Sequence, residues 1–69
     1  MQHVVFAVLT VLGSAAPQAP QVTTFRTDDC KAGMEQVVRS YSLQQFVRSW
    51  SVKSMTADNG KLHLKVTCN

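Results

Sequence analysis

The sequence predicts a small α+β domain in which one helix packs on a short antiparallel sheet, in the order β-α-β-β, with a C-terminal hairpin. Two patterns favour this class: an apolar stripe of helical period over residues 29–42, and two alternating runs around Asn59-Gly60. The length of 69 residues fits one domain, and 45% apolar residues is typical of a folded chain. A core this small needs a disulfide, a metal or a partner for stability.

Residues 1–15 have the layout of a secretory signal peptide. Residues 4–12 read VVFAVLTVL, and small residues follow at 13–16. This apolar run is shorter than the roughly 20 residues of a membrane-spanning helix. We therefore expect cleavage between Ala15 and Ala16 and a secreted, extracellular protein. The alternative for the same segment is a buried N-terminal strand of the fold.

The segment after the expected cleavage site predicts a leader followed by a strand. Residues 16–21 contain both prolines of the chain and no large apolar residue, which favours an extended conformation. Residues 22–27 are rich in β-branched side chains, which favour a strand. The folded domain is therefore expected over residues 22–69.

A helix is expected over residues 29–42. Asp28 or Asp29 can cap its first turn by accepting hydrogen bonds from free backbone N–H groups. Residues 43–48 keep helical spacing. The helix therefore either extends through them or gives way to a strand that begins near 46–48, which we favour. The apolar stripe of the helix consists of Cys30, Met34, Val37, Val38 and Tyr41.

The C-terminal hairpin is the clearest element. Alternation in the last strand separates an apolar face, Leu62, Leu64, Val66 and Cys68, from a polar face, Lys61, His63, Lys65 and Thr67. A three-residue loop sets Val52 against Val66 and Trp50 against Cys68, whereas a two-residue loop sets Lys53 against Val66. We expect the first register, with Gly60 at positive φ, because it keeps the apolar face together. Trp50 is then a core residue, with an exposed binding anchor as the alternative.

Cys30 and Cys68 are the two cysteines of the chain, and in an oxidising compartment they allow one intramolecular pairing. The bond would join the start of the helix to the last strand. On the chain-entropy model, closing a loop of about 39 residues stabilises the fold by roughly 4 kcal/mol. Free or intermolecular thiols are the alternative.

The sequence gives no support for catalysis, metal binding or a cofactor. His63 stands between two lysines of the polar face, and no nucleophile motif, phosphate-binding loop or dinucleotide fingerprint occurs. After the expected cleavage the chain keeps two cysteines and one histidine, His63, and these lack the spacing and the fourth ligand of a zinc site. We therefore expect no enzyme activity, no metal and no cofactor.

Basic residues form the candidate binding surface. Seven Lys and Arg against four Asp and Glu give a formal charge of +3. In the expected register, Lys53 and Lys65 are cross-strand neighbours. Such a surface fits an acidic protein or another anionic surface, including anionic lipid, and we do not expect nucleic acid as the partner. Solubility and edge protection are the alternative role. We call the candidate set the basic hairpin face: Arg48, Lys53, Lys61, His63 and Lys65.

A signal peptide, an Ala/Pro/Gln leader and one disulfide around a small α+β body resemble small secreted effector proteins of filamentous fungi. The β-α-β-β order is also similar to part of the sandwich in viral killer toxins. This resemblance concerns the layout of the whole chain and carries no residue-level motif, so no functional residue is transferred from it. It implies a secreted, non-enzymatic binding protein, effector-like or toxin-like, that acts on a host or competitor molecule.

Two other function classes fit a small cationic secreted chain. The first is a membrane-active or antimicrobial protein, although the charged and apolar residues do not form one long basic amphipathic helix. The second is a secreted inhibitor of a hydrolase.

Intact mass spectrometry tests cleavage and disulfide formation together. We expect the secreted product to begin near Ala16 and to gain the mass of two hydrogens on reduction. A product that retains Met1 and does not change mass on reduction would contradict both expectations.

Overall fold

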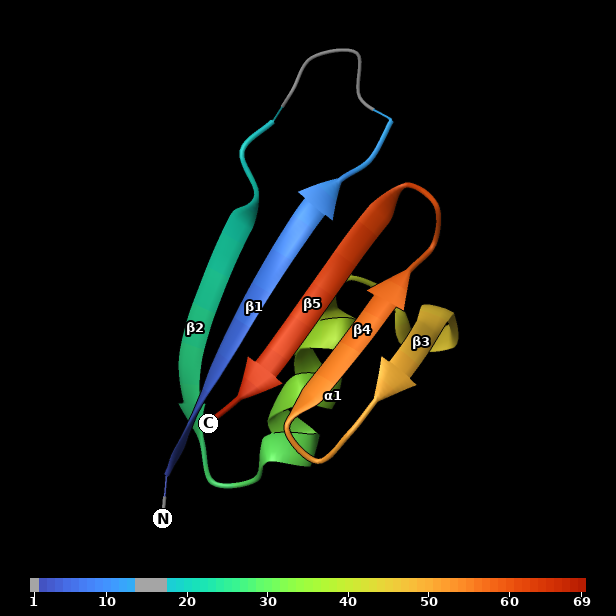
Figure 1. Ribbon diagram of the computed structural model, residues 1–69. Coiled ribbons are helices and arrows are strands. Elements are labelled where there is room, and N and C mark those ends of the chain that lie inside the picture. Colours follow the sequence, from blue (N-terminus) through green and yellow to red (C-terminus); the bar gives the residue numbers. More distant parts are fainter. Residues whose placement is uncertain (1, 14–17) are drawn as a thin grey trace.

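The computed structural model describes residues 2–13 and 18–69, and Figure 1 shows one sheet with a single helix on one of its faces. Helix α1 spans Cys30–Ser40, and a short 3-10 helix, η1, spans Gln44–Phe46. The spatial order of the antiparallel strands is β2-β1-β5-β4-β3. The expected α+β class, with one helix and a C-terminal hairpin, is confirmed. The strands are β1 (His3–Val11), β2 (Gln21–Thr27), β3 (Val47–Trp50), β4 (Ser54–Asp58) and β5 (Leu62–Cys68).

The element order differs from the expected β-α-β-β in two places. β1 adds a strand in the middle of the sheet. The strand expected before the hairpin is in fact two strands, β3 and β4, separated by a turn at residues 51–53. In the segment expected to be a leader, residues 18–20 form neither helix nor strand, and β2 begins at Gln21.

β1 comes from the segment with the signal-peptide pattern. It pairs with β2 on one side and with β5 on the other, and Val5 and Ala7 are buried on its helix-facing side. The bond between Ala15 and Ala16 lies outside the described residues, and cleavage there stays a prediction. A product cleaved at that bond would lack β1, so the five-stranded sheet is the fold of the uncleaved chain.

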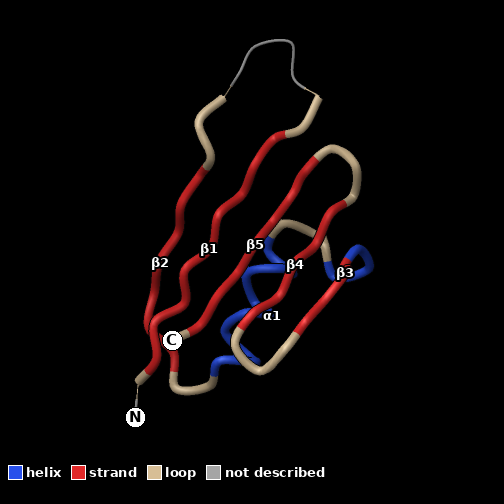
Figure 2. Tube along the Cα trace, in the orientation of Figure 1, coloured by secondary structure: helices blue, strands red, loops and turns tan. Residues whose placement is uncertain are grey.

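The core lies between α1 and one face of the sheet. The expected apolar parity of the last strand is confirmed, because Leu64, Val66 and Cys68 are buried. The opposite face, which we call the open face, lies away from α1 in Figures 1 and 2 and carries Val4 and Phe6, 46% and 44% exposed. The core residues are Val5, Ala7, Leu9, Met34, Val37, Val38, Leu43, Met55, Ala57, Leu64, Val66 and Cys68.

α1 lies within the range expected for it. Asp29 is its N-cap, and Asp29 Oδ1 accepts hydrogen bonds from the backbone N–H groups of Lys31 (3.0 Å) and Ala32 (3.3 Å). Ser42, with φ 58°, lies just past the helix, and η1 and β3 follow, so the expected strand start near 46–48 is confirmed. Within the described residues, no helix has the length and hydrophobicity that spanning a bilayer requires.

Gly33 lies where α1 packs closely against the sheet. A Cβ at this position would lie 2.9 Å from Thr27 Cγ2 and 3.1 Å from Val5 Cγ2. Contacts this short would push the helix away from β1 and β2. Glycine weakens the helix by about 1 kcal/mol relative to alanine, and in return it permits this close packing.

The expected disulfide is present. It joins Cys30, the first residue of α1, to Cys68, the last residue of β5. The two Cα atoms are 5.7 Å apart, and the sequence separation is 38. The bond therefore fastens the start of the helix to a central strand of the sheet.

The register of the C-terminal hairpin differs from the expected one. Thr56 lies opposite Lys65, so the expected cross-strand pairing of Lys53 with Lys65 is wrong. Met55 takes the core position that was expected for Val52. The apolar face stays together in both registers, which is why hydrophobic matching alone did not distinguish them.

Side-chain hydrogen bonds in the turn account for the observed register. Asp58 Oδ1 accepts from the Gly60 N–H at 2.8 Å, and Asn59 Oδ1 accepts from the N–H groups of Lys61 (2.9 Å) and Leu62 (2.7 Å). These bonds close a turn in which Asp58 pairs with His63, so four residues, 59–62, lie between the paired positions. The expected loop had three. The expected positive φ of Gly60 is confirmed, at 88°.

Trp50 and Val52 were expected in the core and are instead exposed, by 66% and 79% respectively. Trp50 pairs with Met55 in the edge strand β3. Its side chain points to the same side of the sheet as α1, as expected. It lies beyond the strands that α1 covers. Val52 lies in the turn between β3 and β4.

Neighbouring valines of β1 provide a matched test of the sheet. Val5 is fully buried, whereas Val4 is 46% exposed on the open face. We expect Val5→Ala to lower the free energy of unfolding by about 2 kcal/mol, because it removes buried methyl groups and leaves a cavity. Val4→Ala should change it by less than about 0.5 kcal/mol. Urea denaturation measures both, and equal losses would contradict the central position of β1.

Candidate functional site

The basic hairpin face does not form one compact patch. Lys53 lies in the turn before β4, and Lys61 lies in the turn after it, so β4 separates the two. His63 and Lys65 alternate with the buried residues of β5 and lie on the open face. These residues spread positive charge over the molecule, which favours long-range attraction over a single anion site.

Arg48 and His63 meet at Asp58. Arg48 lies at the register shift in β3, and its Nε donates to the Asp58 carbonyl oxygen at 3.2 Å. His63 Nδ1 lies 3.1 Å from Asp58 Oδ2. Two of the five predicted binding residues are therefore engaged by the one acidic residue of the hairpin.

The pKa of Asp58 is lowered from its usual value of 3.8. The hydrogen bond from the Gly60 N–H is the largest cause, and the hydrogen bond with the His63 side chain is the next. The charges of His63 and Arg48 act in the same direction. The carboxylate is therefore favoured in its ionised form, in which it holds the end of the hairpin closed.

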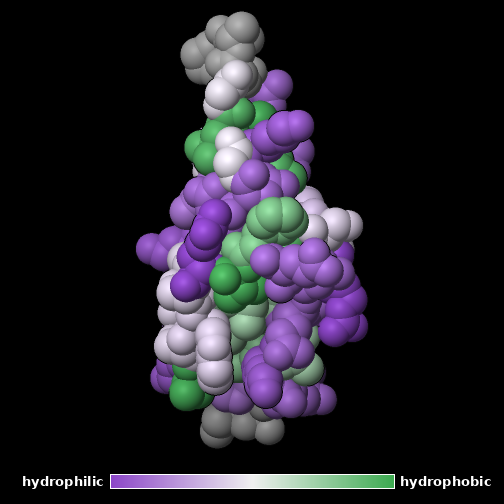
Figure 3. All heavy atoms as spheres, turned by 90° about the vertical axis from the view of Figure 1, so that its right-hand side faces the viewer, coloured by the Kyte–Doolittle hydropathy of each residue, from purple (hydrophilic) through white to green (hydrophobic). Residues whose placement is uncertain are grey.

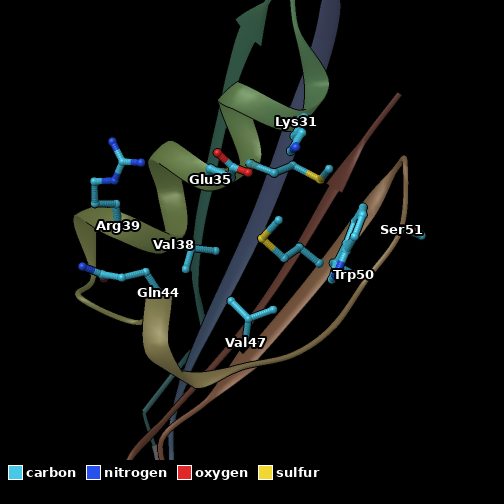
Figure 4. A pocket seen from close by; sticks show the side chains of 10 residues that line it. Lys31, Glu35, Val38, Arg39, Gln44, Val47, Trp50 and Ser51 are labelled. Atoms are coloured by element: carbon cyan, nitrogen blue, oxygen red, sulfur yellow. The ribbon is translucent and has the colours of Figure 1, made fainter.

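A groove of about 350 Å³ lies between α1 and the edge strand β3, and we call it the Trp50 groove. Apolar side chains from three elements line it: Met34 and Val38 from α1, Val47 and Trp50 from β3, and Met55 from β4. Figure 4 shows the Trp50 ring on the side of the groove opposite the helix. Figure 3, which faces the β3 edge, shows hydrophobic surface bordered by hydrophilic residues.

The Trp50 groove results from the position of α1, which packs mainly on β1, β5 and β4. β3 lies beyond β4 at the end of the sheet. Its helix-facing side chains therefore form a wall across from α1 and do not become part of the core. Trp50, the largest of them, remains 66% exposed.

The rim of the Trp50 groove is polar and carries more positive than negative charge. Lys31, Glu35 and Arg39 follow one another at four-residue spacing along the side of α1 that borders it. Lys31 and Trp50 both line the groove, from α1 and β3 respectively. Lys53, from the basic hairpin face, lies three residues after Trp50 in the adjoining turn. The groove therefore combines apolar walls with a basic surround.

Sequence reasoning assigned Trp50 the correct side of the sheet but the wrong exposure. Strand parity predicts the side that a residue faces, and burial depends on which strands the helix covers. The sequence of the helix did contain a signal for this solvent-exposed border. The apolar residues Met34 and Val38 are flanked there by three charged residues, Lys31, Glu35 and Arg39. That pattern is typical of an apolar surface that ends at solvent.

The described residues contain no cluster of three or more His, Cys, Asp or Glu side chains placed to hold a metal ion. The chain matches no protein-family profile, no curated protein and no solved structure. Function is therefore inferred from the groove and from the charges around it.

Because the pKa of Asp58 is lowered, the stability of the hairpin varies with pH in the acidic range. Because the folded state binds this proton less tightly than the unfolded state, the stabilisation is present above the unfolded pKa and is lost as pH falls through the folded one. We expect the free energy of unfolding of Asp58→Asn to fall less steeply below about pH 4 than that of the wild type. Denaturant titrations across this range measure the slope.

Asp28→Asn, which changes an exposed carboxylate outside the hairpin, is the matched control. It should retain the part of the acid dependence that comes from Asp58. Identical slopes for the wild type and Asp58→Asn would contradict the assignment of the lowered pKa to this residue.

Proposed function

We propose that the protein is a small secreted, non-enzymatic binding protein, effector-like or toxin-like, that in its uncleaved form recognises an acidic partner protein through the Trp50 groove. The exposed Trp50 ring beside an apolar hollow is the observation that carries this proposal. The Cys30–Cys68 disulfide supports an extracellular setting, because such bonds persist in oxidising compartments.

The chemistry of the Trp50 groove fits a protein side chain as its occupant. Tryptophan is enriched among the residues that dominate binding energy at protein interfaces, where it fills or lines desolvated pockets. Met34 and Met55 add polarizable, adaptable walls on the helix side and the sheet side. A partner that inserts an apolar side chain here would bury surface that the free protein leaves in contact with water.

The charge around the Trp50 groove favours an acidic partner. Lys31 and Arg39 outnumber Glu35 on the helix rim, and Lys53 lies in the adjoining turn. The whole chain carries a formal charge of +3. In this proposal the dispersed residues of the basic hairpin face, such as Lys61 and Lys65, speed up the encounter, and the groove provides the specific contact.

Fluorescence anisotropy with two labelled peptides tests the proposal. One peptide carries a phenylalanine flanked by leucines among glutamates, and the other has lysine in place of every glutamate. We expect the glutamate peptide to bind more tightly and its binding to weaken with added salt. We expect Trp50→Ala to weaken binding at least tenfold, which is the scale of a central interface residue.

Val52→Ala is the matched control, because Val52 is 79% exposed and lies only two residues from Trp50. It should leave the affinity within about twofold. Equal binding of both peptides, or no effect of Trp50→Ala, would overturn the proposal. Binding to anionic phospholipid vesicles without binding to either peptide would place the protein in the membrane-active class.

A further inference from the structure

The two edges of the sheet differ in how well they can accept another strand. β3 is a four-residue edge with a register shift at Arg48, and short, bulged edges resist pairing. β2 is a seven-residue edge that pairs with β1 in one continuous register. Its sequence, QVTTFRT, carries one charge and no proline. β2 therefore lacks the features that usually protect an edge.

The direction of the free backbone groups of β2 follows from hydrogen bonds on the other side of β1. Val4 and Asn69 exchange both backbone hydrogen bonds, at 3.1 and 2.9 Å, so the N–H and C=O of Val4 point toward β5. These groups alternate in direction along an antiparallel strand, so the odd-numbered residues of β1 bond to β2. Their partners on β2 are also odd-numbered. The free N–H and C=O groups therefore belong to Val22, Thr24 and Arg26.

We propose that β2 pairs with β2 of a second copy of this chain, antiparallel and about a twofold axis at Thr24. This arrangement joins two five-stranded sheets into one of ten strands. Thr24 then lies opposite Thr24 of the second copy, and Val22 lies opposite Arg26. All three outward-facing residues of each strand become hydrogen-bonded, so the interface is self-complementary and closed.

Neighbouring registers are less favourable. Moving the strands by two residues in one direction places Pro20 opposite Arg26, and proline has no N–H to donate. Moving them by two residues in the other direction leaves Thr24 opposite Arg26 and requires Asp28, beyond the end of β2, to pair with Val22. The register centred on Thr24 uses only residues that already belong to the strand.

Side-chain pairs support the same register. On the open face, the aliphatic stem of Arg26 can cover Val22 of the second copy, which is 58% exposed in the single chain. On the helix side, Phe25 lies opposite Thr23 of the second copy, and aromatic residues pair well with β-branched ones across strands. The two Arg26 side chains lie at opposite ends of the interface, so like charges are kept apart.

Space beside β2 is compatible with the second copy. In Figures 1 and 2 β2 forms one edge of the sheet, and α1 packs mainly on β1, β5 and β4. A hollow of about 160 Å³ lies between β2 and the helix, lined in part by Phe25 and Tyr41. The added strand would place its own Phe25 and Thr23 opposite Thr23 and Phe25, which line this hollow.

Cysteine cross-linking tests both the dimer and its register. Residues opposite each other at a hydrogen-bonded antiparallel position have Cα atoms about 5.5 Å apart, which suits a disulfide. We expect Thr24→Cys to form a covalent dimer on mild oxidation. Thr23→Cys is the matched control, because the two Thr23 positions are offset and should not cross-link. Both products are read by non-reducing mass spectrometry.

Sedimentation of the full chain provides the second measurement. We expect a concentration-dependent dimer in the wild type, and we expect Thr24→Lys to raise the dimer dissociation constant at least tenfold, because two lysines would meet at the axis. Circular dichroism verifies that Thr24→Lys keeps the fold. Trp50→Ala should leave the dimer unchanged, because Trp50 lies on the opposite edge of the sheet.

Three results would overturn the dimer. The first is a wild-type chain that stays monomeric up to several hundred micromolar. The second is a dimer in which Thr23→Cys cross-links as readily as Thr24→Cys. The third is open-ended growth into longer assemblies, because a twofold pairing of β2 closes on itself.

Discussion

One short helix has to cover five strands, and the rest of the molecule follows from this mismatch. A helix with its side chains is about 10 Å wide, whereas five strands spaced about 4.8 Å apart place the outer strand axes about 19 Å from each other. α1 packs mainly on β1, β5 and β4. The two outer strands are therefore left with helix-facing side chains that it does not cover. This leaves the Trp50 groove at the β3 edge and a smaller hollow beside β2.

The segment that became β1 shows the limit of interpreting hydrophobicity alone. A strand covered on one face usually alternates apolar and polar residues, whereas Val4 and Phe6 on the open face of β1 are as apolar as the buried Val5 and Ala7. The alternation is therefore hidden, and the continuous run matches the hydrophobic region of a signal peptide. Burial distinguishes the two sides of β1, and burial depends on a helix that begins 19 residues after β1 ends.

Local chemistry could be predicted well, and relations between elements less well. Asp29 as a candidate cap, the disulfide between Cys30 and Cys68, and the parity of Leu64 and Val66 all follow from nearby residues or from a single possible pairing. The hairpin register depended on which side chains close the turn, and Asn59 favoured a longer loop than hydrophobic matching did. The candidate site depended on how far the helix reaches across the sheet, which no local pattern contains.

The disulfide divides the chain into two parts with different connectivity. Residues 30–68 form a covalent ring that holds α1, β3, β4 and β5. β1 and β2 lie outside this ring and are attached to it through the pairing of β1 with β5 and through packing under α1. Separation of the β1–β2 pair as a unit exposes the core while leaving the ring closed, so it is a natural sub-global opening of the fold. The core therefore depends on an inner strand that the disulfide does not hold, and the lifetime of the β1–β5 pairing sets the lifetime of the core.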